Sequence, residues 1–345
     1  MTNDQQLGRS FSLATGIGSL PHREVQRACD FLEENFRDSL LFWPQLVKRS
    51  FNENMYVQYS QGLPGVKIDV AGKKIYIDTQ TEEFLKQLED CYLHILNNDR
   101  EYFAVSSGYA AGFYESLRRI KKLPGLKFFK GQIIGPISFG LSVTDEKQAA
   151  IIHHAEFSQV LVKVLGLKAK WQIRKIKEAN PAVEAVIFID EPYLVSVGSS
   201  FISLSKEKIA AALGAMVAAI HEEEALAGIH CCGNTDWGLV LACGIDILSF
   251  DAFNYADNLL LFAEALQAFL KRGGVLAWGI VPTDKENLSS AAAGVLIKRI
   301  KAAAQKSAIS LDKVIITPSC GCGTLDEASA QRAHLLAKAV AAGLA

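Results

Sequence analysis

The feature that most constrains the fold is a regular alternation of short apolar segments with helical segments, from about residue 180 onward. The apolar segments are rich in β-branched residues, as are parallel strands that are buried on both faces. Five of them follow one another, at residues 185–190, 226–232, 245–250, 275–281 and 313–319. Between them apolar residues recur every three to four positions, which predicts amphipathic helices. The second half of the chain is therefore predicted to consist of βα units.

The first half of the chain supplies three more predicted strands, at residues 13–20, 39–45 and 126–135. Eight parallel strands that alternate with helices are the number that closes a (β/α)₈ TIM barrel. A doubly wound open sheet is the competing fold, but the chain lacks the G-x-G-x-x-G and G-x-x-x-x-G-K-[ST] motifs of nucleotide-binding sheets. We therefore expect an α/β protein with a single barrel over residues 1–345.

An insertion separates the second and third predicted strands. It covers residues 46–122, and within it the segment GVKIDVAGKKIYIDT predicts a β-hairpin that turns at Ala71-Gly72. Helical segments fill most of the remainder. We expect this insertion to lie over the mouth of the barrel, as a lid or a wall of the substrate site.

Composition and charge exclude several classes of function. The chain has 36 basic and 37 acidic residues and no arginine-rich segment with interleaved aromatics, so we expect no nucleic-acid binding. No apolar run approaches the ~18–20 residues that span a bilayer, and the N-terminus lacks the pattern of a secretory signal. We expect a cytoplasmic protein without membrane association. In that reducing compartment the seven cysteines are expected to serve metal or thiol chemistry instead of a disulfide framework.

Polar residues follow the predicted strands at the points where the strands end. In a (β/α)₈ barrel the reacting groups lie at these carboxyl ends. The candidates there are Ser19, His22, Asp190, Glu191, His230, Cys231, Cys232, Asp251, Cys320 and Cys322. Burying two adjacent carboxylates at the end of an apolar strand costs free energy unless they contact water or a cationic group. We therefore expect Asp190 and Glu191 to have a functional role.

Imidazole and thiol groups gather at two of these strand ends. His230 and Cys232 are two residues apart on a strand, so their side chains point to the same side and Cys231 points to the other. Either Cys320 or Cys322 could complete a site with three ligands. Sulfur and imidazole favour zinc over magnesium or calcium, and three protein ligands leave a fourth position for water or substrate. Zinc deprotonates a bound thiol at neutral pH, which prepares the nucleophile for alkyl transfer.

A purely structural origin stays open for parts of this pattern. A buried cysteine often serves as a small hydrophobic residue in a strand. Asp251 is equally well placed to cap the helix that follows its strand. His22 lies just past the first strand and is a further candidate for the mouth of the barrel.

Taken together, these motifs resemble those of the catalytic barrel of cobalamin-independent methionine synthase and its relatives in the uroporphyrinogen decarboxylase-like superfamily. The resemblance extends from Gly16 to about Leu325. Four motifs carry it: Ile17-Gly18-Ser19-Leu20-Pro21 is similar to Ile-Gly-Ser-Phe-Pro, Asp190-Glu191-Pro192 to Asp-Glu-Pro, His230-x-Cys232 to the zinc-binding His-x-Cys, and Pro318-Ser319-Cys320-Gly321 to Pro-Asp-Cys-Gly.

The resemblance implies a zinc-dependent methyltransferase that acts on a small thiol, which is homocysteine in the synthase. It implies His230, Cys232 and Cys320 as zinc ligands, with Cys320 preferred over Cys322. Asp251 lies where the family carries a glutamate, and is implied as a displaceable fourth ligand.

The same resemblance implies a substrate site beside the metal. Asp190 is the implied catalytic residue and holds the amine of the substrate, while Ser19 contacts its carboxylate end. Gly18 and Glu191 are expected to complete the substrate-binding residues.

Departures from the synthase pattern bear on the methyl donor. The segment 230–235 is closer to the His-x-Cys-Gly-Asn-Thr of corrinoid-dependent methyltransferases in the same superfamily. The 345 residues contain no counterpart of the synthase's N-terminal barrel. The histidine that follows the seventh strand in the synthase is missing from residues 281–285. Asp251 is one methylene shorter than the glutamate that the family carries there. These departures favour a methyl-corrinoid protein over folate as the donor.

Three alternatives remain at this point. A uroporphyrinogen decarboxylase-like enzyme would use the same barrel without metal, but it needs arginines at the mouth, and the first strand region offers only Arg9 and Arg23. A thiol alkyltransferase of the corrinoid or coenzyme M type would use the same zinc chemistry on another thiol. A non-catalytic module that binds a metal or a corrinoid partner would hold zinc without transferring a methyl group.

Overall fold

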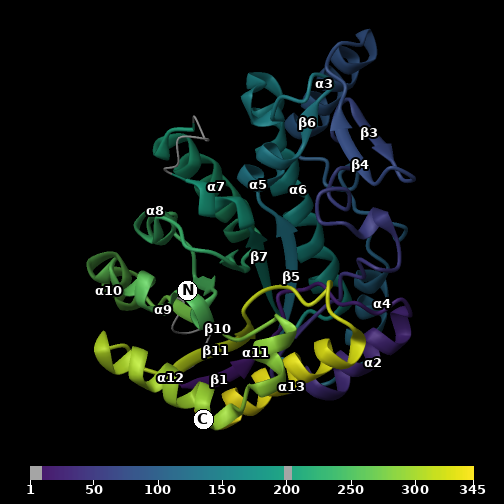
Figure 1. Ribbon diagram of the computed structural model, residues 1–345. Helices are drawn as coiled ribbons and strands as arrows, with labels where there is room; N and C mark the ends of the chain where they lie inside the picture. The colour runs from purple at the N-terminus through teal and green to yellow at the C-terminus, as the bar shows by residue number, and fades with distance from the viewer. Residues whose placement is uncertain (1–9, 198–203) are drawn as a thin grey trace.

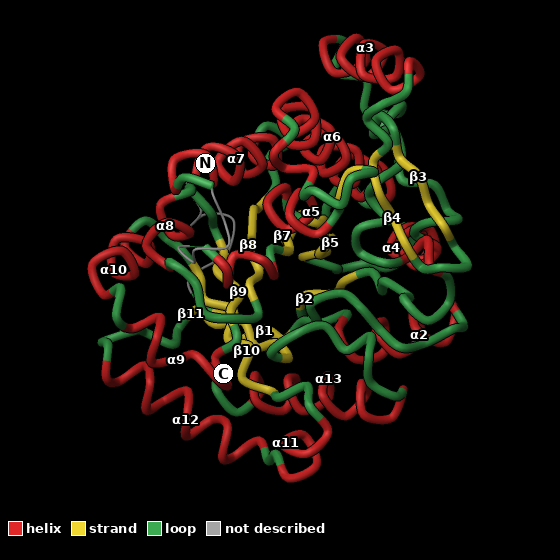
Figure 2. The backbone as a smooth tube through the Cα atoms, turned by 45° about the horizontal axis from the view of Figure 1, so that its top comes forward, coloured by secondary structure: helices red, strands yellow, loops and turns green. Residues whose placement is uncertain are grey.

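A computed structural model of the chain describes residues 10–197 and 204–345, so Arg9 and the rest of the N-terminal segment before Ser10 lie outside the described residues. Eight parallel strands form one sheet that curls into a nearly closed barrel, with the helices outside it (Figure 1; Figure 2). In the order in which they pair, these strands are β1 (Phe11–Ala14), β11 (Lys313–Pro318), β10 (Val275–Val281), β9 (Ile247–Phe250), β8 (Leu226–Cys231), β7 (Glu184–Asp190), β5 (Phe128–Ile134) and β2 (Leu40–Phe42). The predicted (β/α)₈ TIM barrel is confirmed.

The barrel closes at a seam between β1 and β2, where the described residues form no continuous ladder. Near the carboxyl ends, the Gln45 amide donates to Gly18 O (3.0 Å) and the Leu20 amide donates to Gln45 O (2.8 Å). Between the last residue of β1 and the residue before β2, the Ser39 hydroxyl accepts from the Ala14 amide (2.6 Å) and donates to the Ala14 carbonyl (2.8 Å). The first strand was predicted at residues 13–20, but it begins at Phe11 and ends at Ala14. Beyond Ala14 the chain leaves regular strand geometry, and Gly18 has a φ of +152°.

The helices cover the outer face of the barrel. They are α2 (Val25–Phe36), α5 (Pro136–Ser142), α6 (Ala155–Ala179), α7 (Lys206–His221), α8 (Trp237–Ala242), α9 (Ala252–Leu260), α10 (Ala263–Lys271), α11 (Lys285–Ser290), α12 (Ala293–Lys306) and α13 (Glu327–Ala342). Several begin at a side chain that accepts from an amide of the first turn, such as Ser205 before α7 and Asp326 before α13. No helix within the described ranges has both the length and the apolar character needed to cross a membrane.

Two hydrophobic cores hold the barrel together. The larger lies between the sheet and the helices, and the smaller lies inside the barrel. The inner core contains Leu40, Val186, Phe188, Leu226, Ile247, Val275, Ala277 and Ile315. Because side chains alternate along a strand, the positions two residues after Phe188 and Ile315 share this inner face. These positions are Asp190 and Thr317, so the interior changes from apolar to polar toward the carboxyl ends of the strands.

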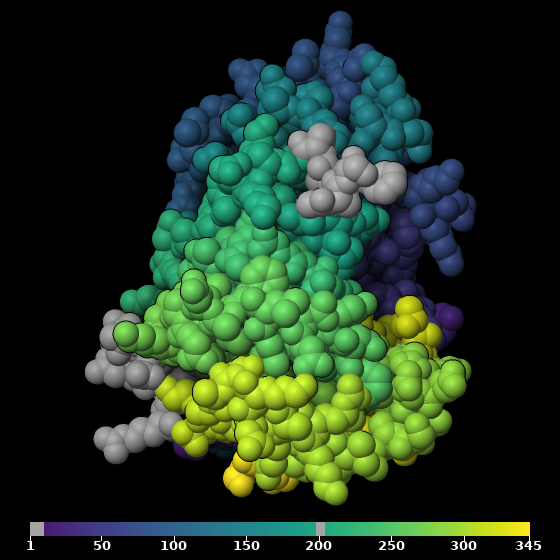
Figure 3. All heavy atoms as spheres, turned by 60° about the vertical axis from the view of Figure 1, so that its left-hand side comes forward, coloured from purple at the N-terminus to yellow at the C-terminus, as the bar shows by residue number. Residues whose placement is uncertain are grey.

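The segment between β2 and β5 contains a β-hairpin. β3 (Val66–Asp69) pairs antiparallel with β4 (Lys74–Ile77), so the turn includes the predicted Ala71-Gly72, and β4 also pairs with β6 (Thr144–Asp145). The helices α3 (Glu82–Leu96) and α4 (Ala111–Ile120) follow in the chain. In the space-filling view, blue residues of this segment lie at the top of the molecule and in a lobe on its right-hand side, whereas most of the yellow C-terminal part lies at the bottom (Figure 3). That the insertion is a lid or a substrate wall stays a prediction.

Candidate metal centre and substrate site

Three side chains from two strand ends converge at the carboxyl end of the barrel. His230 belongs to β8, Cys232 follows that strand directly, and Cys320 lies two residues after β11. One ring nitrogen and two sulfurs from these residues all lie within 4.8 Å of one another. Cys231 and Cys322 are instead buried in the outer hydrophobic core. The structure therefore brings together the three residues that the family resemblance implied as ligands, with Cys320 and not Cys322 in the cluster.

The environment of His230 fits a metal ligand. Its Nδ1 is hydrogen-bonded to the Ser249 hydroxyl at 2.9 Å. Its Nε2 is buried and has no hydrogen-bond partner among the described residues. Metal-binding histidines commonly present this arrangement, in which one nitrogen is hydrogen-bonded and the other is left for the ion. One imidazole and two thiolates suit zinc and leave a fourth coordination position open.

The two thiols of the cluster are electrostatically coupled. A hydrogen bond with Cys232 holds the pKa of Cys320 well below its usual range; burial opposes this shift and the nearby His230 reinforces it. The same hydrogen bond, together with burial, raises the pKa of Cys232. The pair therefore favours the thiolate form of one sulfur, with the other sulfur keeping its proton. A metal ion bound by both sulfurs would take them as thiolates and release the proton that the pair shares.

Unpaired polar atoms line the inner wall beside the cluster. They are Gln132 Oε1 from β5, Asp190 Oδ1 from β7 and Thr317 Oγ1 from β11, each buried without a hydrogen-bond partner in the described part of the chain. Asp190 lies directly opposite His230 in the pairing of β7 with β8. Gln132 Nε2 donates to Trp43 O at 3.3 Å, so the amide oxygen is the atom left free. Buried polar atoms require partners, and a ligand with hydrogen-bond donors, such as an ammonium group, would supply them here.

Lys130 lies on the same inner face and was not predicted from the sequence, and neither was Gln132. Both interrupt the apolar strand β5 at positions of the same parity, and this spacing is the signal that could have placed them inside the barrel. Burial raises the pKa of Asp190, whereas the charges of His230 and Lys130 oppose that shift.

Ser19 holds the loop that carries Cys320, and Gly18 before it packs closely against Gln132. A Cβ at position 18 would lie 2.8 Å from Gln132 Cδ, and the φ of +152° is one that residues with a side chain rarely adopt, so glycine is favoured there. Ser19 O accepts from the Cys322 amide (3.1 Å), and Ser19 Oγ accepts from the Gly323 amide (3.2 Å). The predicted contacts of Gly18 and Ser19 with substrate stay predictions.

Glu191 is fully buried beneath the start of helix α5. Its carboxylate accepts from the Ile137 amide (3.0 Å), the Ser138 amide (2.8 Å) and the Ser138 hydroxyl (2.6 Å). Burial raises the pKa of Glu191 to about 7, although these hydrogen bonds oppose the shift. These three donors satisfy the hydrogen-bonding needs of the carboxylate without a substrate. They therefore do not favour the predicted role of Glu191 in substrate binding.

Asp251 is not one of the three residues that converge. Its Oδ1 accepts from the Asn254 amide (2.9 Å) and its Oδ2 from Asn254 Nδ2 (2.7 Å), so it caps helix α9. This is the alternative that the sequence left open, and coordination by Asp251 stays a prediction. His22 is buried beside Phe31 of α2, with the two ring centroids 6.3 Å apart, and is likewise outside the cluster.

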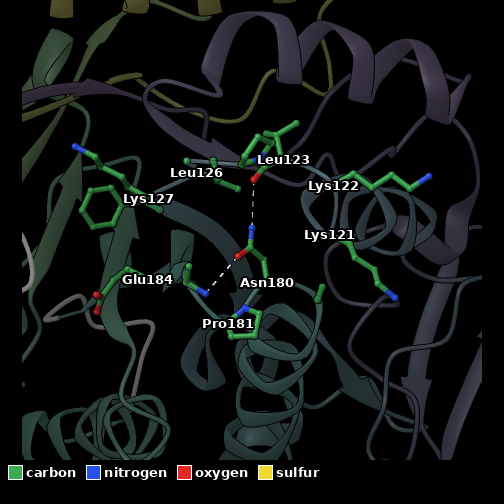
Figure 4. A pocket seen from close by; sticks show the side chains of 13 residues that line it. Lys121, Lys122, Leu123, Leu126, Lys127, Asn180, Pro181 and Glu184 are labelled. Atoms are coloured by element: carbon green, nitrogen blue, oxygen red, sulfur yellow. Dashed lines mark hydrogen bonds between the residues drawn. The ribbon is translucent and has the colours of Figure 1, made fainter.

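A surface hollow of about 830 Å³ lies at the opposite end of the strands, where β5 and β7 begin. Asn180 Nδ2 donates to Ile120 O (3.0 Å) and Leu123 O (3.4 Å) inside it. Figure 4 shows the side chains of Lys121 and Lys122 pointing away from Asn180. The reacting groups of a (β/α)₈ barrel lie at the other end, so this hollow is not a candidate active site.

Comparison with known proteins gives a match among solved structures but none by sequence. No protein-family model matches the chain, and no curated protein matches it. Among solved structures, a B12-independent methionine synthase from Shewanella sp. W3-18-1, in complex with selenomethionine, is similar with a TM-score of 0.46 and 16% sequence identity. The match covers 66% of this chain and 65% of the synthase chain, which is less than two thirds of the latter.

Proposed function

We propose that this protein is a zinc-dependent methyltransferase that moves a methyl group to a small thiol, with homocysteine as the expected acceptor. The observation that carries the proposal is the convergence of the ligand atoms of His230, Cys232 and Cys320 within 4.8 Å of one another at the carboxyl end of the barrel. This ligand set leaves room for an incoming sulfur.

Zinc at these three residues would lower the pKa of an incoming thiol, so that the thiolate is available at neutral pH. The chain's own residues fix the rest of the geometry. Ser249 orients the His230 ring through Nδ1. Asp190 Oδ1 and Gln132 Oε1 offer acceptors to the amine of the substrate, and Ser19 is proposed to bind its carboxylate. The sulfur forms its bond to the methyl carbon as the bond from that carbon to the donor breaks, and the electron pair stays on the donor.

A methyl-corrinoid protein is the donor that we propose. The support comes from the sequence, in which the segment 230–235 is similar to the His-x-Cys-Gly-Asn-Thr of corrinoid-dependent methyltransferases. Methyl transfer to homocysteine from methylcobalamin, compared with transfer from methyl-folate, tests this choice. Faster transfer from methyl-folate would overturn it.

The central test compares two neighbouring cysteines. Cys320→Ala removes a proposed ligand, whereas Cys322→Ala removes a thiol of the outer hydrophobic core two residues away. We expect the wild type and Cys322→Ala to bind one zinc ion per chain and to methylate homocysteine, and Cys320→Ala to lose both properties. Unchanged zinc stoichiometry in Cys320→Ala would remove Cys320 from the site and contradict the proposal.

The same assays separate the alternatives. Transfer to coenzyme M in preference to homocysteine would indicate the other class of thiol alkyltransferase. Full zinc occupancy without transfer to any thiol of a panel would indicate a binding module. Decarboxylation of a porphyrinogen by metal-free protein would indicate a decarboxylase.

A further inference from the structure

Lys130 is a charged residue in the middle of the barrel. It is 0% exposed, and its Nζ donates to Ile17 O at 2.7 Å. The ammonium also lies 4.7 Å from the centroid of the Phe188 ring and 5.5 Å from that of Phe42. A buried ammonium is costly unless such partners compensate it, so its retention in a barrel interior calls for a structural or functional reason.

The acceptor of this hydrogen bond lies at the weakest part of the barrel wall. Ile17 belongs to the segment after β1, where the described part of the chain forms only two backbone hydrogen bonds to the segment after β2. Lys130 reaches this segment from β5, on the far side of β2 in the sheet order. Gln132, two residues further along β5, packs against Gly18. Two side chains of one strand therefore hold the backbone of residues 17–18 in place.

The segment held by Lys130 in turn holds the loop of the metal ligand. Ser19 accepts hydrogen bonds from the Cys322 amide through its carbonyl and from the Gly323 amide through its hydroxyl. Cys320 begins this loop, directly after Ser319. A continuous path of short contacts thus joins Lys130 to Cys320 through residues 17–19 of the chain.

We infer that Lys130 is a positioning residue that sets the place of Cys320 in the metal cluster by fixing the backbone of Ile17. The part of this inference that concerns metal affinity rests on the proposed function. The part that concerns the position of the loop does not, because the contacts from Lys130 to Gly323 involve no metal.

The structure offers a matched control for a test of this role. Lys168 in helix α6 is also 0% exposed, and its Nζ also donates to a backbone carbonyl, Phe103 O, at 3.0 Å. Methionine has nearly the length of lysine and suits an apolar interior, so Lys130→Met and Lys168→Met should both fold. Ser19→Ala interrupts the same path at a half-buried position and serves as a second variant.

The first measurement is amide hydrogen exchange of metal-free protein over residues 319–325. We expect exchange at the Cys322 and Gly323 amides to accelerate in Lys130→Met. In Ser19→Ala, which removes only the hydroxyl acceptor, we expect it to accelerate at the Gly323 amide. In Lys168→Met both amides should exchange at the wild-type rate. Unchanged exchange in Lys130→Met would overturn the inference, even if the proposed function held.

The second measurement is zinc affinity by competition with a chelator. Residues that orient a metal ligand typically contribute about tenfold to a hundredfold, so we expect the zinc dissociation constant to rise at least about tenfold in Lys130→Met and not in Lys168→Met. A loss of zinc affinity without faster exchange would show that Lys130 acts through its charge, and would overturn the positioning role. A wild-type protein that binds no zinc would refute the proposed function, while the exchange measurement would still decide the inference.

Discussion

Lys168 shows how a single buried charge affects the whole chain's stability. It is fully buried in α6, and burial lowers its pKa from 10.5 to about 7. Between these pH values the unfolded chain binds a proton that the folded chain does not bind. The free energy of unfolding therefore rises with pH across this window, because the unfolded state binds more protons.

Replacing Lys168 by methionine removes this contribution to the pH dependence of the free energy of unfolding. We expect the free energy of unfolding of Lys168→Met to rise less steeply with pH than that of the wild type from about pH 7 to 10.5, by at most about 1.4 kcal/mol per pH unit. Urea unfolding of both proteins at several pH values measures the difference. Parallel pH profiles would show that Lys168 keeps an ordinary pKa in the folded protein.

The sequence was sufficient to predict residues whose spacing along a strand determines where their side chains point. His230 and Cys232 were predicted to face one side and Cys231 the other, and the structure shows this because side chains alternate along β8. Ser249 was missed, since its contact with His230 depends on the pairing of β8 with β9. Lys130 was missed because a lysine inside a barrel contradicts the usual preference for apolar residues there.

At the scale of elements, Glu191 and helix α5 depend on each other. The Glu191 carboxylate accepts from two amides and one hydroxyl at the start of α5. Glu191→Ala would leave these buried donors without an acceptor, so we expect the free energy of unfolding to fall by about 2 kcal/mol or more. Zinc stoichiometry should not change. Denaturant unfolding and metal analysis check both expectations.

The neighbouring carboxylate provides the contrast. Asp190 Oδ1 has no partner among the described residues, so Asp190→Ala should cost little stability but raise the KM for homocysteine. If Glu191→Ala instead kept its stability and raised the KM, Glu191 would belong to the substrate site, as the sequence analysis predicted.

The order of strands and the hairpin were predictable at this scale, whereas the seam of the barrel was not. Apolar segments of steady spacing indicate strands, and Ala71-Gly72 between two alternating segments indicates the turn of β3 and β4. The early end of β1 depends on Gly18 and on contacts with β5 and with the loop after β11. These contacts join segments that are far apart in the sequence, so no local pattern reveals them.

The proposed metal site joins two distant segments of the chain. Its three candidate ligands belong to β8 with the residue after it and to the loop after β11, which are about ninety residues apart in the sequence. Zinc that binds only the folded chain raises its stability, by about 2.7 kcal/mol when free zinc is a hundred times the dissociation constant. We expect chelation to lower the Tm of the wild type by several degrees.

Cys320→Ala is the control for this effect. Its Tm should be the same with zinc and with chelator, whereas Cys322→Ala should respond as the wild type does. Thermal unfolding followed by circular dichroism measures all three proteins. A wild type whose Tm is insensitive to chelation would speak against a zinc ion that links the two segments.

Metal binding by these three residues can be observed directly by anomalous scattering at the zinc absorption edge, from a crystal of the zinc-loaded protein. We expect one zinc ion per chain, bound by His230 Nε2 and by the sulfurs of Cys232 and Cys320 at the usual distances of about 2.0–2.3 Å. A crystal in which these three residues bind no zinc, or in which Cys231 or Cys322 takes the place of a proposed ligand, would contradict it.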